Sequence, residues 1–356
     1  MDYSEVSVKA VELLKKMIAI PSFSRSEAEV SALIKSDMVL NGYEPQEMGL
    51  NLILRGRHNR GGRPVLMLNS HMDTVKPVKD WQRDPFAPVV EDGCLYGLGS
   101  NDDGAGLVCL LNTFYLLDRK EQPYDLIFVA TAEEEMNGVG GMKLVAPQLP
   151  EISVALIGEP TGMRPAIAEK GLMVLDFTVQ GKSGHAARNE GVNAIYRAME
   201  VIEMIKNLEL SEQSELLGPV KKSVTIINAG TQHNVVPGEC TFTADIRSNE
   251  FYSNHRLFDI ISSMLPEWCT VKARSFILNS SRIDPANPII QRAVRMGLEP
   301  FGSPTLSDQA VLSCPSFKLG PGESSRSHTA DEFVRIEEIE KAIPLYMALL
   351  DGMEII

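Results

Sequence analysis

Short runs of apolar residues alternate with segments of helical periodicity in the first half of the chain. The apolar runs cover residues 64–70, 125–131 and 153–159, and each ends in polar residues. Such runs are typical of strands that are covered on both faces. Residues 104–117 and 136–145, which lie between them, are predicted to be helices. This β-α-β alternation predicts a mainly parallel sheet that is sandwiched between helices.

The hydrophobic pattern changes after about residue 168. The following segment predicts strands and helices in the order β-α-β-β-α-β, at residues 172–180, 194–208, 223–230, 240–247, 251–265 and 269–278. This order suggests a small antiparallel sheet with two helices, a ferredoxin-like α+β arrangement. From about residue 282 the pattern returns to helices and a short strand. We therefore predict a catalytic domain formed by residues 1–168 and 282–356, with residues 169–281 as an inserted domain.

Composition and charge exclude several classes of protein. Hydrophobic residues make up 44% of the 356 residues and charged residues 23%, as expected for a globular protein. The formal net charge of −13 argues against nucleic acid as a partner, because phosphates would repel the chain. No apolar run is long enough to span a membrane. The first residues lack the pattern of a secretion signal, and the five cysteines form no CxxC pair. We therefore expect reduced thiols and a cytoplasmic location.

Two polar motifs stand out beside the predicted strands. His71 and Asp73 follow the first buried strand in NSHMDTV (69–75). His71 could ligate a metal ion while Asp73 accepts a hydrogen bond from its other ring nitrogen, because alternate residues of an extended segment share a face. Asp102 and Asp103 lie in a glycine-rich loop before a helix. Taken singly, these motifs also fit a hydrogen-bonded histidine at a strand end and an aspartate at a helix start.

Three further segments carry candidate ligands. The triplet Glu133–Glu135 follows the second buried strand, where three adjacent acids are electrostatically costly unless a cation neutralises them. A solvated helix start is the alternative interpretation. Glu159 follows the third buried strand, and His328 lies in a loop of glycine, serine and arginine. In open α/β sheets, sites gather where strands end. Two histidines and at least three carboxylates would then meet, which suits zinc, with cobalt or manganese as alternatives.

Taken together and in this order, the motifs resemble the di-zinc amidohydrolases that include acetylornithine deacetylase, succinyl-diaminopimelate desuccinylase and aminoacylase. The resemblance covers nearly the whole chain. It rests on HMDTV, GLGSNDDGAG, AEEE, GEPTG, GKSGHAA, NVVP with ADIR, and GPGESSRSH. It implies a hydrolase with two divalent metal ions. It also implies that the inserted domain serves as a lid and joins two chains into a homodimer.

The resemblance also implies roles for individual residues. One ion would be bound by His71, Asp102 and Glu159, and the other by Asp102, Glu135 and His328. Asp102 would bridge the two ions, and the peptide bond after it is usually cis in this family. Asp73 would orient the histidine of the first site, and Glu134 would act as the general base.

Two departures from the family pattern are present. The family commonly has lysine two residues after the bridging aspartate, where this chain has Gly104. The family's pair of acids is here a triplet, so a shift by one residue would make Glu133 the base and Glu134 the ligand. Whether Ser324, Ser325 and Arg326 bind substrate or only shape the loop around His328 stays open at this point.

The resemblance assigns substrate contacts as well. His185, in GKSGHAA, would reach the active site of the partner subunit and stabilise the oxyanion. Asn234 and Arg247 would hold the substrate, with Arg247 binding a carboxylate as a bidentate pair or, alternatively, forming a surface ion pair. Gly320 and Gly322 would offer backbone donors near the substrate.

We expect hydrolysis of a small-molecule N-acyl amino acid to a free amine and a carboxylate. The motifs look most like the acetylornithine deacetylase branch, which implies N-acetylornithine, or an N-acetyl or N-succinyl derivative of citrulline or ornithine, in arginine biosynthesis. A succinyl-diaminopimelate desuccinylase or a dipeptidase of the same chemistry is the alternative. A non-catalytic binding protein that kept the fold is the alternative of another class.

Overall fold

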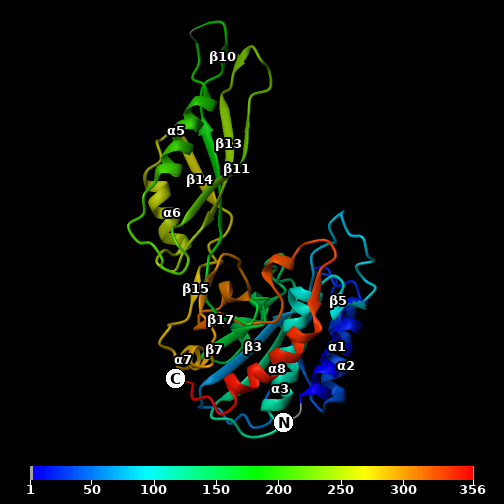
Figure 1. Ribbon diagram of the computed structural model, residues 1–356. Helices are drawn as coiled ribbons and strands as arrows, with labels where there is room; N and C mark the ends of the chain where they lie inside the picture. Colours follow the sequence, from blue (N-terminus) through cyan, green and yellow to red (C-terminus); the bar gives the residue numbers. More distant parts are fainter. Residues whose placement is uncertain (1–2, 189, 356) are drawn as a thin grey trace. The chain divides into compact units, whose positions relative to one another are not determined.

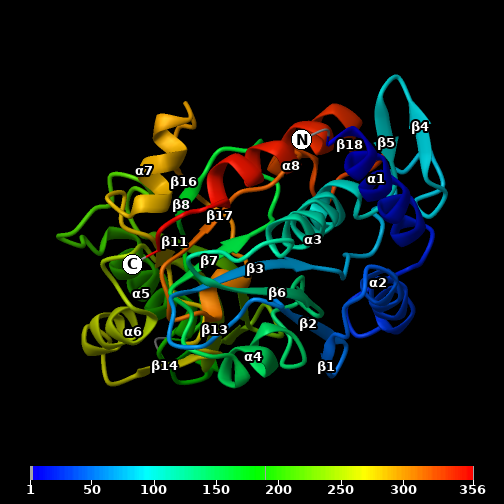
Figure 2. The same ribbon diagram turned by 90° about the horizontal axis from the view of Figure 1, so that it is seen from below.

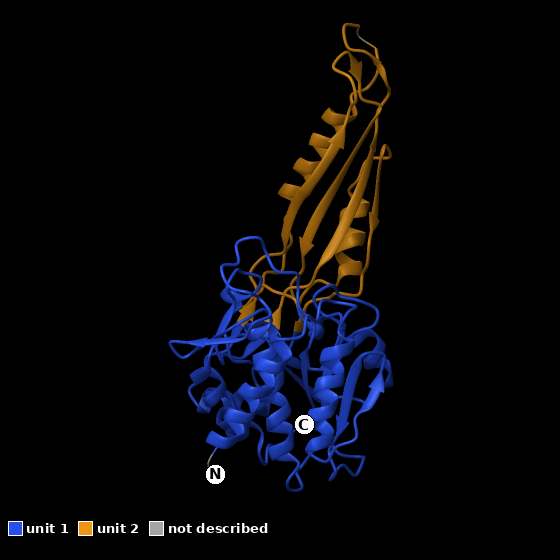
Figure 3. Cartoon of the chain, turned by 90° about the vertical axis from the view of Figure 1, so that its right-hand side faces the viewer, with its two compact units in different colours: residues 1–167, 282–301, 307–356 blue, residues 168–281, 302–306 orange. Residues whose placement is uncertain are grey.

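The computed structural model describes residues 3–188 and 190–355 and divides into two compact units (Figure 3). Unit 1 comprises residues 1–167, 282–301 and 307–356, and unit 2 comprises residues 168–281 and 302–306. Residues 302–306 thus group with unit 2, whereas the predicted boundaries assigned them to the catalytic domain. The reason is local: Lys170 donates its backbone N–H to Ser303 O at 3.2 Å, and Gly302 lies against the backbone of Leu216.

Unit 1 is built on a mainly parallel sheet, as predicted. The strand order is β1-β2-β6-β3-β7-β17-β8-β15, with β16 beside β8, and β6, β3, β7 and β17 run parallel. These four strands are buried along their length, which explains their continuous apolar sequences. The strands of this sheet are β1 (Gln46–Met48), β2 (Asn51–Arg55), β3 (Val65–His71), β6 (Asp125–Thr131), β7 (Val154–Ile157), β8 (Ala166–Glu169), β15 (Ser281–Arg282), β16 (Phe301–Ser303) and β17 (Ser316–Lys318).

Helices cover both faces of this sheet (Figure 2). Helix α3 is apolar on all sides because it lies between the sheet and helices α1 and α8. On the other face, α4 packs on a core of β3, β6 and β7 side chains. The helices are α1 (Ser4–Ile18), α2 (Ala28–Leu40), α3 (Ala105–Leu117), α4 (Met142–Val145), α7 (Pro288–Arg295) and α8 (Ile336–Leu350), with short turns η1 (Ser100–Gly104), η2 (Ala146–Gln148), η3 (Asp308–Val311) and η4 (Ser324–Arg326). A small separate sheet contains β4 (Val89–Glu91), β5 (Cys94–Tyr96) and β18 (Phe333–Arg335).

The predicted helix over residues 136–145 is wrong in its first half. Only Met142–Val145 is helical. Asn137 has a positive φ of 50°, and Gly138 and Gly140 lie against the side chain of Glu133. This close packing and the left-handed backbone hold the segment after β6 as a loop instead of a helix.

Unit 2 has the predicted ferredoxin-like arrangement (Figure 1). Its four-stranded antiparallel sheet has the order β11-β13-β9-β14, and α5 packs against it. The core includes Phe177 and Phe242, whose rings stack 4.4 Å apart. The elements are β9 (Met173–Gln180), α5 (Ala194–Asn207), β11 (Lys221–Ala229), β13 (Glu239–Arg247), α6 (Asn254–Ser263) and β14 (Cys269–Ala273), with a short pair formed by β10 (Gly184–His185) and β12 (Val235–Val236).

Among the described residues, no helix combines the length and the apolar character needed to cross a bilayer. The five cysteines form no disulfide.

Candidate metal centre

The candidate ligands gather where three parallel strands of unit 1 end. His71 is the last residue of β3, the glutamate triplet begins two residues after β6, and Glu159 follows two residues after β7. Because β3 pairs with both β6 and β7, these three strand ends are neighbours. The sheet therefore brings together side chains that are far apart in the sequence.

Asp102 lies between the two candidate histidines. Its Oδ1 is 3.1 Å from His71 Nε2, and its Oδ2 is 3.7 Å from His328 Nε2. The two oxygens of one carboxylate thus face two different imidazoles, as a bridging ligand requires. The peptide bond between Asp102 and Asp103 is cis.

The two histidines are each paired with a further carboxylate. His71 Nε2 lies 3.7 Å from Glu159 Oε1, and His328 Nε2 lies 2.9 Å from Glu135 Oε2. Hydrogen bonding to Glu135 raises the pKa of His328 to about 9. The five predicted ligands therefore form one continuous chain of contacts, with Asp102 at its centre.

His71 is buried and its ring is held from behind. Its Nδ1 donates to the backbone oxygen of Asp73 at 2.9 Å, while the carboxylate of Asp73 lies 3.6 Å from the same nitrogen. A protonated Nδ1 leaves Nε2, on the side of Asp102 and Glu159, as the nitrogen that could bind a metal ion in place of a proton. Burial alone would lower the pKa of His71, but hydrogen bonds to Asp102 and Asp73 raise it well above its usual value.

The carboxylate of Asp73 has a second task that the sequence did not indicate. It accepts hydrogen bonds from the backbone N–H groups of Glu134 and Glu135, at 3.0 and 3.2 Å. It also accepts from Ser24 Oγ at 2.6 Å. Asp73 thus fixes the backbone of the glutamate loop as well as the ring of His71.

The three glutamates of the triplet point to different places. Glu134 groups with His71 and Glu159, and Glu135 groups with His71 and Asp102, each set within 4.8 Å. Glu133 has a positive φ of 55°, and its side chain accepts from the backbone N–H of Gly140. The structure therefore places Glu134 and Glu135 in the site and turns Glu133 away from it.

The site fits a pair of divalent cations by its donor chemistry. Imidazole nitrogens and carboxylate oxygens converge, and these are the ligands that zinc and related hydrolytic metals take. Burial raises the pKa of Glu134 well above its usual range, and the neighbouring Glu159, Asp308 and Glu135 add to this. Bound cations would offset this repulsion between carboxylates.

Three further residues beside the site were not predicted from the sequence. Glu332 accepts the backbone N–H groups of Gly99, Asn101 and Asp102 at 3.1, 2.8 and 2.9 Å, and so anchors the loop of the bridging carboxylate. Asp308 accepts from Thr131 Oγ1 at 2.6 Å. Lys318 lies 3.8 Å from Glu159 Oε2. Only Lys318 had a signal in the sequence, because a charged residue inside an apolar strand is unusual.

The loop before His328 is tied to the neighbouring elements β18 and α8. Arg326 donates to both carboxylate oxygens of Glu338, at 2.7 and 3.1 Å, and stacks over the ring of Phe333. Arg326 is thus bound to α8 and β18 in this structure. His328 itself has a positive φ of 58°.

The predicted backbone donors at Gly320 and Gly322 need one correction. The N–H of Gly320 donates to Thr161 Oγ1 at 3.2 Å, so it is already used within unit 1. Gly320 is tightly packed against the backbone of Gly158, which leaves no space for a side chain. Gly322 has a positive φ of 84°, and its carbonyl accepts from Gly162 N.

Three predicted site residues belong to unit 2. His185 and Asn234 lie together, because His185 in β10 pairs with Val235 in β12. β13 begins shortly after β12, and Arg247 is its last residue. The guanidinium of Arg247 donates to both carboxylate oxygens of Asp245, at 2.8 and 3.1 Å. Within unit 2, Arg247 is therefore not brought next to His185 and Asn234.

The absence of a side chain at position 104 has a steric reason. A Cβ at Gly104 would lie 2.6 Å from Leu14 Cδ1 and even closer to the backbone oxygen of Gly99. The chain could not carry a lysine here without moving α1 or the loop before α3.

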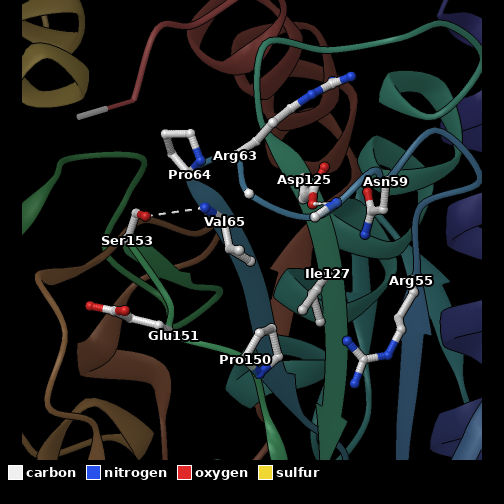
Figure 4. Close-up of a pocket in the computed structure, with 12 residues that line it drawn as sticks. Arg55, Asn59, Arg63, Pro64, Val65, Asp125, Ile127, Pro150, Glu151 and Ser153 are labelled. Atoms are coloured by element: carbon white, nitrogen blue, oxygen red, sulfur yellow. Dashed lines mark hydrogen bonds between the residues drawn. The ribbon is translucent and has the colours of Figure 1, made fainter.

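A hollow of about 620 Å³ lies at the opposite ends of the same strands (Figure 4). Val65 and Asp125, the first residues of β3 and β6, line it. The Arg63 guanidinium beside it is bonded to Glu121 and to Gln122 O at 2.6 Å. Since it lies at the amino ends of the strands, the hollow is separate from the candidate metal centre.

Known proteins resemble this chain along most of its length. The model of Peptidase family M20/M25/M40 matches residues 67–352. Acetylornithine deacetylase from Proteus mirabilis is 26% identical over 96% of both chains. Succinyl-diaminopimelate desuccinylase from Xanthomonas campestris is also 26% identical, over 96% of this chain and 98% of that protein.

Solved structures show the same fold. Aminopeptidase PepT from Bacillus cereus superposes with a TM-score of 0.78 at 20% identity, covering 97% of this chain and 98% of that chain. The YXEP protein of Bacillus subtilis, described as a dinuclear metal-binding peptidase, gives a TM-score of 0.74 at 18% identity, with 97% of each chain covered.

Proposed function

Because the chain belongs to Peptidase family M20/M25/M40, we propose that it is a di-metal hydrolase that removes the N-acyl group from an N-acyl amino acid. The observation that carries this proposal is Asp102, whose two oxygens face His71 and His328 separately. His71, Asp102 and Glu159 would hold one ion, and Asp102, Glu135 and His328 the other. Zinc is our first choice of metal, with cobalt or manganese as alternatives.

Bound ions would polarise the scissile carbonyl and lower the pKa of the attacking water, so that the water loses a proton more readily. Glu134 would take the proton of the attacking water and pass it to the leaving amine. Asp73 would hold Glu134 in place through the backbone N–H.

Residues of unit 2 complete the proposal. We assign His185 as the donor that stabilises the oxyanion, acting from the partner subunit, and Asn234 and Arg247 as substrate contacts. Arg247 would exchange its bond to Asp245 for a substrate carboxylate, which is the same kind of bidentate pair. Gly322 stays a candidate donor.

A homodimer through unit 2 is part of the proposal. Strand β11 is an edge of its sheet and is largely exposed, with Ile226 and Ile227 each 51% exposed. Tyr196 and Met199 are exposed on α5, which packs next to β11. An apolar edge of this kind favours pairing with a second copy. Light scattering that gave a strict monomer in the active enzyme would rule out His185 acting across the interface.

We propose N-acetylornithine, or an N-acetyl or N-succinyl derivative of ornithine or citrulline, as the substrate. Relatives with two different names match at equal identity, so a desuccinylase specificity is the second candidate. The test is amine release from N-acetylornithine, N-acetylcitrulline, N-succinylornithine and N-succinyl-diaminopimelate, with metal-free protein reconstituted with zinc or cobalt. Turnover of one of the first three supports our assignment. Turnover of the last alone supports the desuccinylase, and bound metal without any turnover would favour a dipeptidase or a binding protein.

A further inference from the structure

Lys318 is unusual for its burial. Its exposed fraction is 1%, and it is the one lysine or arginine in the described part of unit 1 that is buried. It is the last residue of β17, in register with Ile157 of β7 on one side and Ala166 of β8 on the other. A buried ammonium group is costly unless an anion lies beside it. The burial of Lys318 therefore has to be explained by the groups around its ammonium.

An anion beside Lys318 is a candidate metal ligand. Lys318 Nζ lies 3.8 Å from Glu159 Oε2, whereas the other oxygen, Oε1, lies 3.7 Å from His71 Nε2. The carboxylate thus stands between a lysine and a histidine, with one oxygen toward each. Glu159 is itself buried, so this ion pair is poorly screened by solvent.

We propose that Lys318 is a positioning residue that reserves Oε2 of Glu159 and leaves Oε1 alone for the metal ion shared with His71. This inference rests on the proposed function. Two consequences follow from charge and geometry. Glu159 would bind its ion through one oxygen only, and the positive charge of Lys318 would lower the affinity of the Glu159 side for a cation. Within the described residues, His328 pairs with Glu135 and Asp102 and no lysine pairs with Glu135, so the two sides of the centre would differ in affinity.

The test measures Co²⁺ binding to metal-free protein by calorimetry. Lys318→Met and Lys318→Gln remove the charge, and Lys318→Arg keeps it. We expect one of the two binding steps to tighten about tenfold in both neutral variants, equal to about 1.4 kcal/mol. The arginine variant should stay within about threefold of the wild type. Lys170→Met is the matched control, because Lys170 is the buried lysine of unit 2 and donates to the backbone of Pro219.

Two backgrounds locate the effect. In a His328→Ala background only the His71 side should bind tightly, and Lys318→Met should still tighten it. In a Glu159→Gln background the same substitution should tighten binding much less, because no second carboxylate oxygen is released and only the direct charge repulsion is relieved. A second readout is the visible absorption of bound Co²⁺, which should weaken in Lys318→Met because a second oxygen of Glu159 raises the coordination number.

Unchanged or weaker binding in both folded neutral variants would overturn the inference while leaving the proposed function intact, provided that the wild type binds two ions. Wild-type protein that binds no metal would overturn both. Should Lys318→Met not fold, the uncharged but polar Lys318→Gln and the charge-preserving Lys318→Arg still decide between the two results.

Discussion

Glu135 and His328 are 193 residues apart in the chain, yet His328 Nε2 lies 2.9 Å from Glu135 Oε2. The loop after β6 and the loop before β18 therefore meet over the end of the sheet. Asp102 Oδ2 lies 3.7 Å from the same nitrogen, which joins this pair to the His71 side of the centre. The contact defines the second half of the proposed metal centre.

Replacing His328 should abolish tight binding of one ion. We expect His328→Ala to weaken the second binding step by about 100-fold or more, since even the loss of outer hydrogen bonds to metal ligands costs 10- to 100-fold. Metal content after gel filtration checks this. His58→Ala is the control, because His58 is exposed and lies outside the site. Two tightly bound ions in His328→Ala would contradict the assignment.

Replacing Glu134 should stop the chemistry and spare the metal. We expect Glu134→Gln to lower kcat by about 100- to 10,000-fold, the range for loss of a general base. Its metal content should stay at the wild-type value. The matched variant is Glu133→Gln, which should keep most of its activity because Glu133 is turned toward Gly140. If Glu133→Gln were the more damaging change, the base would be one residue earlier.

Removing the carboxylate of Glu332 should destabilise unit 1. Glu332→Ala leaves three backbone N–H groups without their acceptor, and we expect a loss of about 3 kcal/mol in the free energy of unfolding. Urea unfolding of a Trp268→Phe protein reports on unit 1, where Trp81 is then the remaining tryptophan. The exposed Glu337, changed to alanine, should give a shift below about 0.5 kcal/mol. Equal stability of the two variants would argue against the anchoring role.

A side chain at position 104 should not be tolerated. Gly104→Ala would place a methyl group 2.6 Å from Leu14 Cδ1, and we expect a loss of about 2 kcal/mol in stability. Gly104→Lys, which introduces the residue common in the family, should be worse. Thermal melting checks both variants. A melting temperature within about one degree of the wild-type value would show that the loop before α3 can accommodate the added side chain.

The acid sensitivity of unit 2 should depend on Asp176. Its hydrogen bonds with Arg274 lower the pKa of Asp176 below the usual value. A carboxyl group whose pKa is lowered by folding stabilises the protein above its unfolded pKa of about 4, and this contribution is lost as the pH falls through the folded value. The pair is exposed, so the effect should be below about 1 kcal/mol.

Asp176→Asn should therefore flatten the pH dependence of stability below about pH 4 and leave its shape at higher pH unchanged. Urea unfolding of a Trp81→Phe protein, followed through Trp268 of unit 2, measures it. An unaltered acid limb in the variant would exclude a contribution of this pair.

The sequence predicted the parallel sheet because β3, β6 and β7 are short continuous apolar runs, which are typical of strands buried on both faces. It failed at residues 136–141, where the side chain of Glu133 packs on Gly138 and Gly140. That contact depends on a left-handed backbone at Glu133, which no local pattern of acids predicts. Periodicity therefore predicted the buried elements better than the loop that carries the acids.

The candidate ligands could be found because each follows a recognisable strand or motif. Glu332 could not, since its function is to accept N–H groups about 230 residues earlier in the chain. Such long-range hydrogen bonds between polar residues carry no periodic signal. The ion pair of Arg247 with Asp245, by contrast, is one of the two alternatives predicted for this side chain from the sequence.

The most direct test of the central claim is the metal dependence of hydrolysis. Metal-free protein should show no amine release from the preferred substrate of the panel, and titration with Zn²⁺ should restore activity while up to two ions bind per chain. His71→Ala and Asp102→Ala should bind less metal and stay inactive. Full activity after complete removal of metal, or failure of the wild type to bind any ion, would contradict the account.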